Sequence, residues 1–335
     1  IDVMKNVSKL ALFVAAGMVS AGVNAGEWEL GDNTVVELEG EYNIEYAMTD
    51  TVKSGEDDDV DELGGKAELD LTGERALGSG VTGFVAVGFE FETFEVKDDN
   101  TSEGDNSLKH NGTEAGIEGG FGELVVGDSD NVYEDLITDA TDPFETTSLS
   151  NASRTEESSL VTFYSPDLGG LSYRLQARVI DEKDITANNS TQTSVQAGVS
   201  YDFGMGSVHA AYDQRGTDNV GSDFNQDPVT GLSAAFDLGS NAEVAVKYEM
   251  EDDVNDAKDT DYTSLAVAID YGAGDLYAQY QSVSPDQGDS QSQYGIGVSY
   301  TLVDDLFVYG EFANLDGQKD AAKDTLAAFG LTYAF

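Results

Sequence analysis

The chain has 335 residues and a large acidic excess, with 65 Asp and Glu residues against 16 Lys and Arg and a formal net charge of −49. A chain this acidic repels nucleic acid, so we expect no nucleic-acid partner. Cysteine is absent and only two histidines occur, which excludes a disulfide framework, a catalytic thiol and zinc sites of the cysteine type. We expect no cofactor and no resident metal.

Residues 1–25 have the pattern of a secretory signal peptide. Two lysines precede ten apolar or small residues, and a small-x-small cleavage site ends at Ala25. A transmembrane helix needs about 20 apolar residues, so this stretch is too short for one. We expect Met4 to be the initiator, residues 1–3 to be an upstream remnant and the mature chain to begin at Gly26.

From Asn33 onward, apolar residues recur at every second position, which is the period of a β-strand with one apolar face. Val195, Val199 and Tyr201 belong to one such row. Beyond the signal no apolar stretch is long enough for a helix to span a bilayer, so any membrane insertion must use strands. The alternation predicts sixteen strands, at 34–47, 65–74, 82–95, 112–119, 121–127, 158–165, 171–180, 193–203, 206–215, 229–238, 242–250, 262–271, 275–283, 292–301, 305–314 and 325–335.

The connections between these strands alternate in length. Seven are short and rich in Gly and Asp, and eight are long and acidic, such as Asp50 to Leu63 and the longest, Asp128 to Glu157. Short turns on one side and long loops on the other are typical of a transmembrane β-barrel. We therefore predict an all-β fold in which residues 26–335 form one domain, a barrel of sixteen antiparallel strands that is wide enough to hold water.

The last predicted strand has the clearest alternation, through Phe329, Leu331, Tyr333 and Phe335. An unpaired apolar strand at the end of a soluble protein would promote aggregation. That hazard disappears if the strand closes a barrel in a membrane, where its apolar face meets lipid and its aromatic rings lie at the interface.

Three segments resemble a known family. Glu74 to Phe84, with Leu-Gly-Ser-Gly-Val, is similar to a family turn "DLGNGL"; Phe121 to Gly127 is similar to "FGTLTLG"; and Phe163 to Gly170 is similar to "Y-x-SP-x-F-x-G". They occur in the family's order, and the last two flank the longest loop. The chain therefore resembles the trimeric general diffusion porins of Gram-negative outer membranes.

The resemblance implies a water-filled channel in the outer membrane and a homotrimer in contact with lipid and lipopolysaccharide. It also implies that the barrel-assembly machinery recognises Tyr333-Ala334-Phe335. The third loop, Asp128 to Glu157, would fold inward and narrow the pore; the alternative is an exposed loop like the other acidic loops. The acidic residues that this loop would place at the constriction are Glu134, Asp135, Asp139, Asp142 and Glu145.

The basic side of the pore departs from the family pattern. The family normally has an arginine after "FGTLTLG", and this chain has Asp128. The candidate bases for the pore wall are Arg174 and Arg178, followed by Lys66, Arg75, Arg154 and Lys247, and the alternative for each is an ordinary solvated charge at a strand end. Acidic residues with the parity opposite to the apolar row are expected to line the lumen, among them Glu37, Glu39, Glu41, Glu68 and Asp70.

These features predict a channel for passive diffusion of small hydrophilic solutes and ions that prefers cations, because carboxylates in a pore attract cations and exclude anions. We expect no catalytic step. The alternatives are a substrate-selective channel of the same fold, an outer-membrane barrel enzyme and a secreted adhesin. Adaptation to high salt is a second explanation of the acidity.

Overall fold

The structure is a computed structural model that describes most of the chain after the proposed signal peptide; residues 1–25 lie outside the described residues. Within the part described, no helix is both long and apolar enough to cross a membrane. The described residues are 26–31, 33–53, 56–97, 108–152, 155, 157–179, 193–214, 228–252, 259–315 and 323–335.

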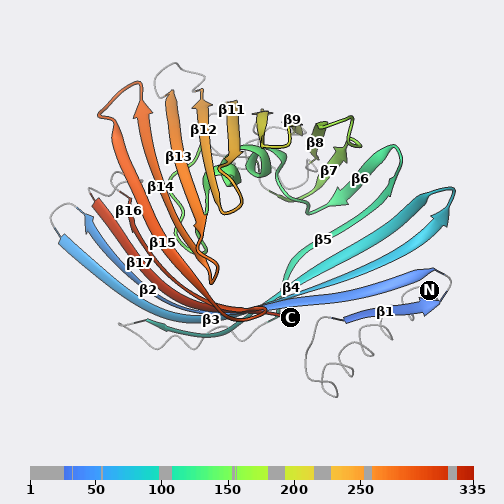
Figure 1. The fold of residues 1–335 in the computed structure, drawn as a ribbon, viewed down its shortest axis with the longest axis horizontal. Coiled ribbons are helices and arrows are strands. Elements are labelled where there is room, and N and C mark those ends of the chain that lie inside the picture. The colour runs from blue at the N-terminus through green and yellow to red at the C-terminus, as the bar shows by residue number, and fades with distance from the viewer. Residues whose placement is uncertain are drawn as a thin grey trace, which may run out of the picture.

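The chain folds into one antiparallel sheet that closes on itself (Figure 1). From β2 onward each strand pairs with the next, and the pairing of β17 with β2 closes the ring. The strands are β1 (Gly26–Gly31), β2 (Thr34–Lys53), β3 (Glu56–Gly78), β4 (Val81–Lys97), β5 (Leu108–Gly119), β6 (Gly122–Gly127), β7 (Leu160–Tyr164), β8 (Leu171–Val179), β9 (Thr193–Asp202), β10 (Gly206–Asp213), β11 (Val229–Asp237), β12 (Ala242–Glu251), β13 (Thr260–Asp270), β14 (Asp275–Pro285), β15 (Gln291–Val303), β16 (Leu306–Asn314) and β17 (Lys323–Ala334).

The sixteen-stranded antiparallel barrel predicted from the alternation is confirmed, because β2 to β17 correspond one by one to the predicted strands. Large apolar side chains cover its outer face, where Leu265, Ile296 and Phe329 are at least half exposed. The inner face is polar. The arrangement is the reverse of that in a soluble protein, where apolar side chains lie inside. It follows because lipid contacts the outer face of a transmembrane barrel and water fills its interior.

β1 was not predicted, because its six residues contain too few alternations to mark a strand. It pairs with the first part of β2, whereas β17 pairs with residues 41–52 of the same strand. Between the two, Gly40 and Phe335 exchange two backbone hydrogen bonds of 2.8 Å. β1 therefore continues the line of β17 along the edge of β2, so the first and last strands of the sheet meet there.

The acidic stretch from Asp50 to Leu63 was predicted to be a long loop, and this is wrong. β2 continues to Lys53 and β3 begins at Glu56, so most of the stretch forms a tall hairpin in which Asp50 lies opposite Asp59. A strand that extends beyond the hydrocarbon layer meets water on both faces, so no apolar row marks it in the sequence.

Candidate functional site

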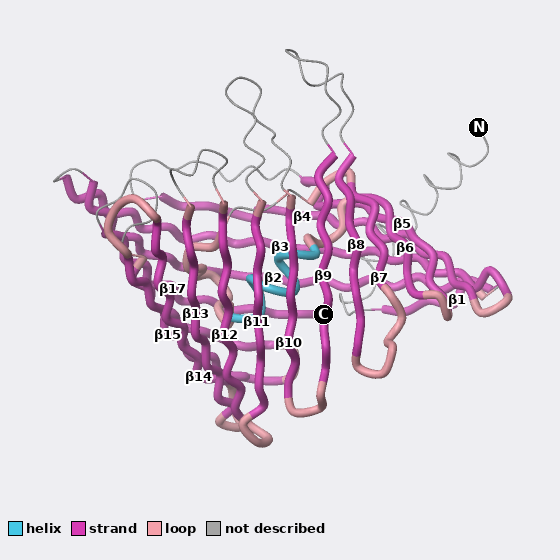
Figure 2. The backbone as a smooth tube through the Cα atoms, turned by 90° about the horizontal axis from the view of Figure 1, so that it is seen from above, coloured by secondary structure: helices cyan, strands magenta, loops and turns pink. Residues whose placement is uncertain are grey.

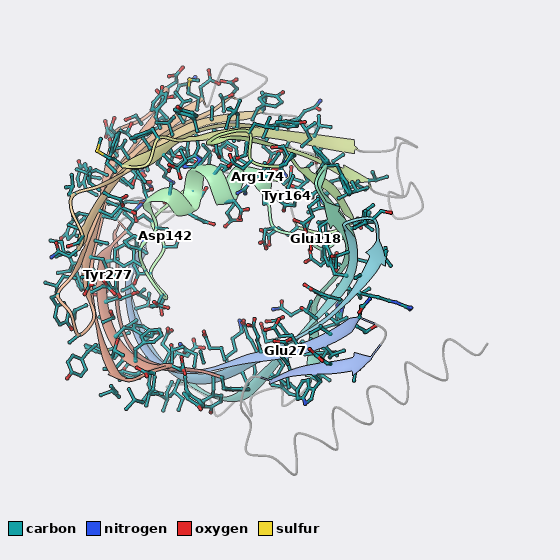
Figure 3. The ribbon with its side chains drawn as sticks, turned by 45° about the vertical axis from the view of Figure 1, so that its right-hand side comes forward. Glu27, Glu118, Asp142, Tyr164, Arg174 and Tyr277 are labelled. Carbon is teal, nitrogen blue, oxygen red and sulfur yellow. The ribbon has the colours of Figure 1, made fainter. Side chains whose placement is uncertain are left out.

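We call the segment between β6 and β7, residues 128–159, the inner loop, and its described residues, 128–152, 155 and 157–159, lie inside the ring of strands (Figure 3). It contains a π-helix, η1 (Glu134–Thr138), and a 3₁₀-helix, η2 (Asp139–Thr141). These helices lie about midway along the strands (Figure 2). In Figure 3, Asp142 of the inner loop and Glu118 of the wall lie on different sides of the ring.

An apolar contact holds the helical part of the inner loop against the wall. Tyr133 and Ile137 are fully buried in a cluster that includes Val229 of β11. A Cβ atom at Gly231 would lie 2.5 Å from Cγ2 of Ile137, so only glycine leaves room for the helix at this point. The helix therefore rests directly on the backbone of the wall.

A single buried carboxylate fixes the middle of the inner loop. Glu311 of β16 accepts hydrogen bonds from the backbone amides of Glu145, Thr146 and Thr147 at 2.7, 3.2 and 2.9 Å, and from the hydroxyl of Tyr277 at 2.8 Å. Hydrogen bonds to a charged acceptor are shorter and stronger than neutral ones. Because three consecutive amides bind the same carboxylate, residues 145–147 are held in one position against β16.

Further polar contacts fix the rest of the inner loop along the same side of the barrel. Asp213 accepts hydrogen bonds from the amide and the hydroxyl of Thr155, both at 2.7 Å, and Gln293 accepts one from the amide of Ser150 at 2.8 Å. We call the buried wall side chains that bond to the inner loop the covered arc: Thr162, Gln176, Arg178, Ser194, Gln196, Asp213, Ser233, Lys247, Glu249, Gln279, Gln281, Gln293 and Glu311.

Asp135 of the inner loop pairs with Arg174 of the wall. The Asp135 Oδ2 to Arg174 Nη1 distance is 2.6 Å, and the guanidinium lies over the ring of Tyr164, 5.5 Å from its centroid. Burial raises the pKa of Asp135 to about 6, with Asp130 and Asp139 adding to the rise and Arg174 opposing it. Arg174 is therefore compensated by a carboxyl that titrates just below neutral pH.

The other predicted acids of the inner loop differ in exposure. Asp142 accepts hydrogen bonds from the amide of Phe144 and the hydroxyl of Ser148, at 3.3 and 3.1 Å, and its burial raises its pKa. Burial also raises the pKa of Glu145, as do the nearby carboxylates of Glu311 and Glu41. Glu134 is half-buried and Asp139 is exposed.

On the wall formed by β2 to β6, acidic side chains lie opposite one another on neighbouring strands. Glu41 faces Glu68, and Glu68 faces Glu90. Like charges in directly opposite positions destabilise a sheet unless solvent and ions screen them. We call these lumen-facing carboxylates, none of which is buried, the acidic arc: Glu37, Glu39, Glu41, Glu45, Glu68, Asp70, Glu90, Glu92, Glu114, Glu118 and Glu123.

The inner loop and the acidic arc meet at a cavity of about 470 Å³. Glu145 and Thr146 contribute from the loop side, and the Thr146 hydroxyl bonds to Glu45. Carboxylates therefore lie on both sides of this cavity. The lining residues are Glu41, Asn43, Glu45, Glu62, Gly64, Gly65, Lys66, Glu68, Glu92, Glu145, Thr146 and Tyr309.

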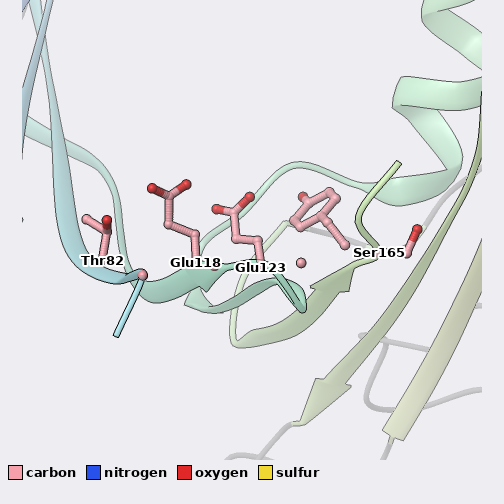
Figure 4. A pocket seen from close by; sticks show the side chains of 8 residues that line it. Thr82, Glu118, Glu123 and Ser165 are labelled. Carbon is pink, nitrogen blue, oxygen red and sulfur yellow. The ribbon is translucent and has the colours of Figure 1, made fainter. Parts of the chain in front are cut away.

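The acidic arc continues toward the end of the barrel that has the short turns. There Glu118 and Glu123 lie opposite each other on β5 and β6 and line a second cavity of about 390 Å³ (Figure 4). Thr82, Tyr164 and Ser165 complete its polar lining. The acidic lining therefore extends from the cavity beside Glu145 to the end of the barrel with the short turns.

Two of the basic residues predicted for the wall, Lys66 and Arg178, are engaged by protein groups. Lys66 pairs with Glu68 and, at 2.9 Å, with Glu90. Arg178 donates hydrogen bonds of 3.1 Å to the carbonyl and the hydroxyl of Ser158. In the part of the chain that the structure describes, no cluster of three or more His, Asp or Glu side chains is arranged to hold a metal.

Asp128 lies away from the cavity of Glu145. It is exposed at the end of β6, where its carboxylate accepts hydrogen bonds from the amides of Thr113 and Ser159 at 3.2 and 3.4 Å. Sequence reasoning missed Glu311 and Asp213 as functional residues. In the sequence, only their lumen-facing position in the strand alternation marks these two residues, and many other residues share that position.

A closed barrel with an apolar outer face and a polar lumen is the architecture of a membrane channel. The chain belongs to the Gram-negative porin family, because the model of this family matches residues 10–335. It is therefore a channel protein of the outer membrane of a Gram-negative bacterium and not an enzyme.

Two curated relatives and two solved structures illustrate the similarity. A "Monosaccharide porin" of Halomonas sp. and a "Major outer membrane protein" of Halomonas elongata are each 26% identical to this chain, over 97% of it and 99% of their own length. Salmonella typhi OmpF in complex with daunomycin has a TM-score of 0.70 at 20% identity, covering 92% of this chain and 100% of its own. A mutant of Rh. blastica porin has a TM-score of 0.68 at 16% identity, covering 90% and 100%.

Proposed function

We propose that this porin passes small hydrophilic solutes and ions by passive diffusion and prefers cations. The carrying observation is that carboxylates line both sides of the 470 Å³ cavity between the inner loop and the acidic arc. The lumen-facing bases of the described wall are engaged by protein groups: Lys66, Lys109, Arg174 and Lys247 each pair with a carboxylate, and Arg178 bonds to Ser158. Size exclusion at the inner loop and the negative potential of the lumen then set the selectivity.

The test is the reversal potential of the purified protein in a planar lipid bilayer that separates two KCl concentrations. A cation-preferring pore gives a potential of the sign set by potassium diffusion, and a potential of the opposite sign would refute the proposal. Repeating the measurement at higher mean salt separates selectivity from general acidity. Screening shortens the reach of the carboxylates to about 3 Å at 1 M salt, so the preference should weaken.

We also propose a homotrimer. Two neighbouring strands are short, β6 with six residues and β7 with five, whereas a tilted strand needs about 9–11 residues to span a bilayer. Their outward side chains, Val126 and Val161, are exposed in the single chain. A second copy of the chain would shield this side from lipid. Chemical cross-linking in detergent is expected to yield trimers, and a species that stays monomeric would contradict this.

Processing and membrane contacts follow from the same assignment. We propose that residues 1–25 are removed as a signal peptide, that lipid and lipopolysaccharide contact the outer face, and that the barrel-assembly machinery recognises Tyr333-Ala334-Phe335. N-terminal sequencing of the exported protein should begin at Gly26, and an intact Met4 would contradict removal.

A second candidate is a channel selective for monosaccharides, which the name of the Halomonas relative favours. Liposome swelling distinguishes the two candidates. A selective channel gives uptake of glucose that saturates with concentration, whereas a general diffusion pore gives uptake that rises in proportion to it.

A further inference from the structure

A buried ion pair lies beneath the inner loop, outside the water-filled lumen. Lys247 and Glu249 occupy successive lumen-facing positions on β12, with 2.8 Å between Nζ and Oε2, and neither side chain is exposed at all. The inner loop completes the pair from above. The Lys247 ammonium donates to Oδ1 of Asn151, and the hydroxyl of Tyr133 donates to Oε1 of Glu249 at 3.2 Å.

The burial of this pair depends on the loop, since Tyr133 belongs to the apolar cluster that seats the helix on the wall. Transfer of a charged side chain from water into the protein interior costs free energy. The attraction between the two charges of a buried pair offsets this cost only while both partners are charged. If Glu249 lost its charge, Lys247 would lose the carboxylate that contacts it, and Asp142 of the inner loop would remain as a nearby negative charge. The long, flexible stem of Lys247 would allow the ammonium to move toward the aqueous lumen.

We propose that Glu249 is a positioning residue that determines selectivity, because it keeps the charge of Lys247 beneath the inner loop and out of the pore. The inference rests on the proposed cation preference and extends it. The acidic arc supplies the attraction for cations, and Glu249 prevents a base from facing that arc across the lumen. Through Tyr133 it also helps to hold the helix of the inner loop in place.

The test compares E249Q with wild type by two measurements on the folded protein in detergent or bilayers. The first is labelling of Lys247 by a membrane-impermeant amine-reactive ester, read by peptide mass spectrometry. The second is the cation-to-anion permeability ratio from reversal potentials. We expect Lys247 to be protected in wild type and labelled in E249Q. The permeability ratio should fall by roughly twofold, because a cation in the lumen repels other cations.

Two further variants separate this role from a general loss of structure. E251Q changes the next lumen-facing acid of β12, which bonds to Tyr262, and should leave Lys247 protected. The double variant K247M/E249M replaces the buried pair by apolar groups, which is often neutral or stabilising, and it should retain the wild-type permeability ratio. If E249Q does not assemble, Y133F removes one hydrogen bond to Glu249 and should give partial labelling.

Reactive Lys247 in wild type, or protected Lys247 in both E249Q and Y133F, would overturn the inference. An unchanged permeability ratio in a labelled E249Q protein would overturn it as well. The labelling result does not depend on the ion preference of the wild-type pore. An anion-selective wild type would therefore refute the proposed function while labelling still decided whether Glu249 confines Lys247.

Discussion

The acidic arc and the covered arc belong to the same antiparallel sheet and share the same alternation, but their charges are compensated differently. On the covered arc, Glu311 and Asp213 are buried and bind backbone amides of the inner loop. On the acidic arc, Glu41, Glu68 and Glu90 lie side by side, and the two bases next to them are Lys66 and Lys109. Buried wall charges therefore position the loop, whereas most carboxylates of the acidic arc face water and passing ions, with Glu45, which bonds to Thr146, as an exception.

The largest effect is expected from neutralising the acidic arc at the constriction. The double variant E41Q/E68Q removes two directly opposite carboxylates from the 470 Å³ cavity. We expect the cation-to-anion permeability ratio to fall by roughly threefold, since a unit charge 4 Å from an ion contributes about 1 kcal/mol in water before screening by salt. Reversal potentials in a KCl gradient measure the change.

The matched control for this variant is D237N/E243Q. Asp237 and Glu243 also lie directly opposite each other, on β11 and β12, but at the short-turn ends of these strands and outside the constriction cavity. This pair should alter the permeability ratio much less. Equal effects of the two double variants would show that total charge sets the selectivity and would remove the distinction drawn between the arcs.

The next effect is expected from releasing the inner loop from the covered arc. E311Q replaces the carboxylate that accepts three consecutive loop amides, and each hydrogen bond to a charged group contributes about 1.5–3 kcal/mol. The loop should become mobile, which raises single-channel conductance and open-channel noise. S264A is the control, because Ser264 is buried nearby but its hydrogen bonds stay within the wall. Unchanged conductance in E311Q would mean that the other contacts suffice.

The smallest effect is a pH dependence that originates in the inner loop. Burial raises the pKa of Asp135 to about 6, so this carboxyl is ionised at pH 7 and mostly protonated at pH 5. Protonation removes a negative charge and leaves Arg174 uncompensated, so cation preference should decrease as the pH falls through 6. D135N should already show the low-pH preference at pH 7 and lose this step. A wild-type preference that is flat from pH 7 to 5 would contradict the prediction.

The strands and their inward parity were predictable because lipid outside and water inside impose one alternation on the whole chain. The same parity places Arg174 and the carboxylates of the acidic arc on the lumen side. The contact of Arg174 with Asp135 was not predictable, because it depends on the path of a loop without periodicity. The anchor Glu311 was missed for a related reason: its partners are backbone amides, which every residue except proline carries.

β1 and Phe335 meet on the same edge of β2, and this arrangement has a consequence for assembly. Gly40 and Phe335 lie almost the full chain length apart, yet their mutual hydrogen bonds join β2 to the end of the chain. Contacts between residues this far apart in the sequence form slowly, because the conformational entropy of the intervening chain must be lost first. Until β17 pairs with both neighbours, β16 and β2 are unpaired edge strands that can pair with a strand of another chain. Closure of the barrel therefore depends on β17, and a chain that lacks this strand is expected to leave β16 and β2 as open sheet edges.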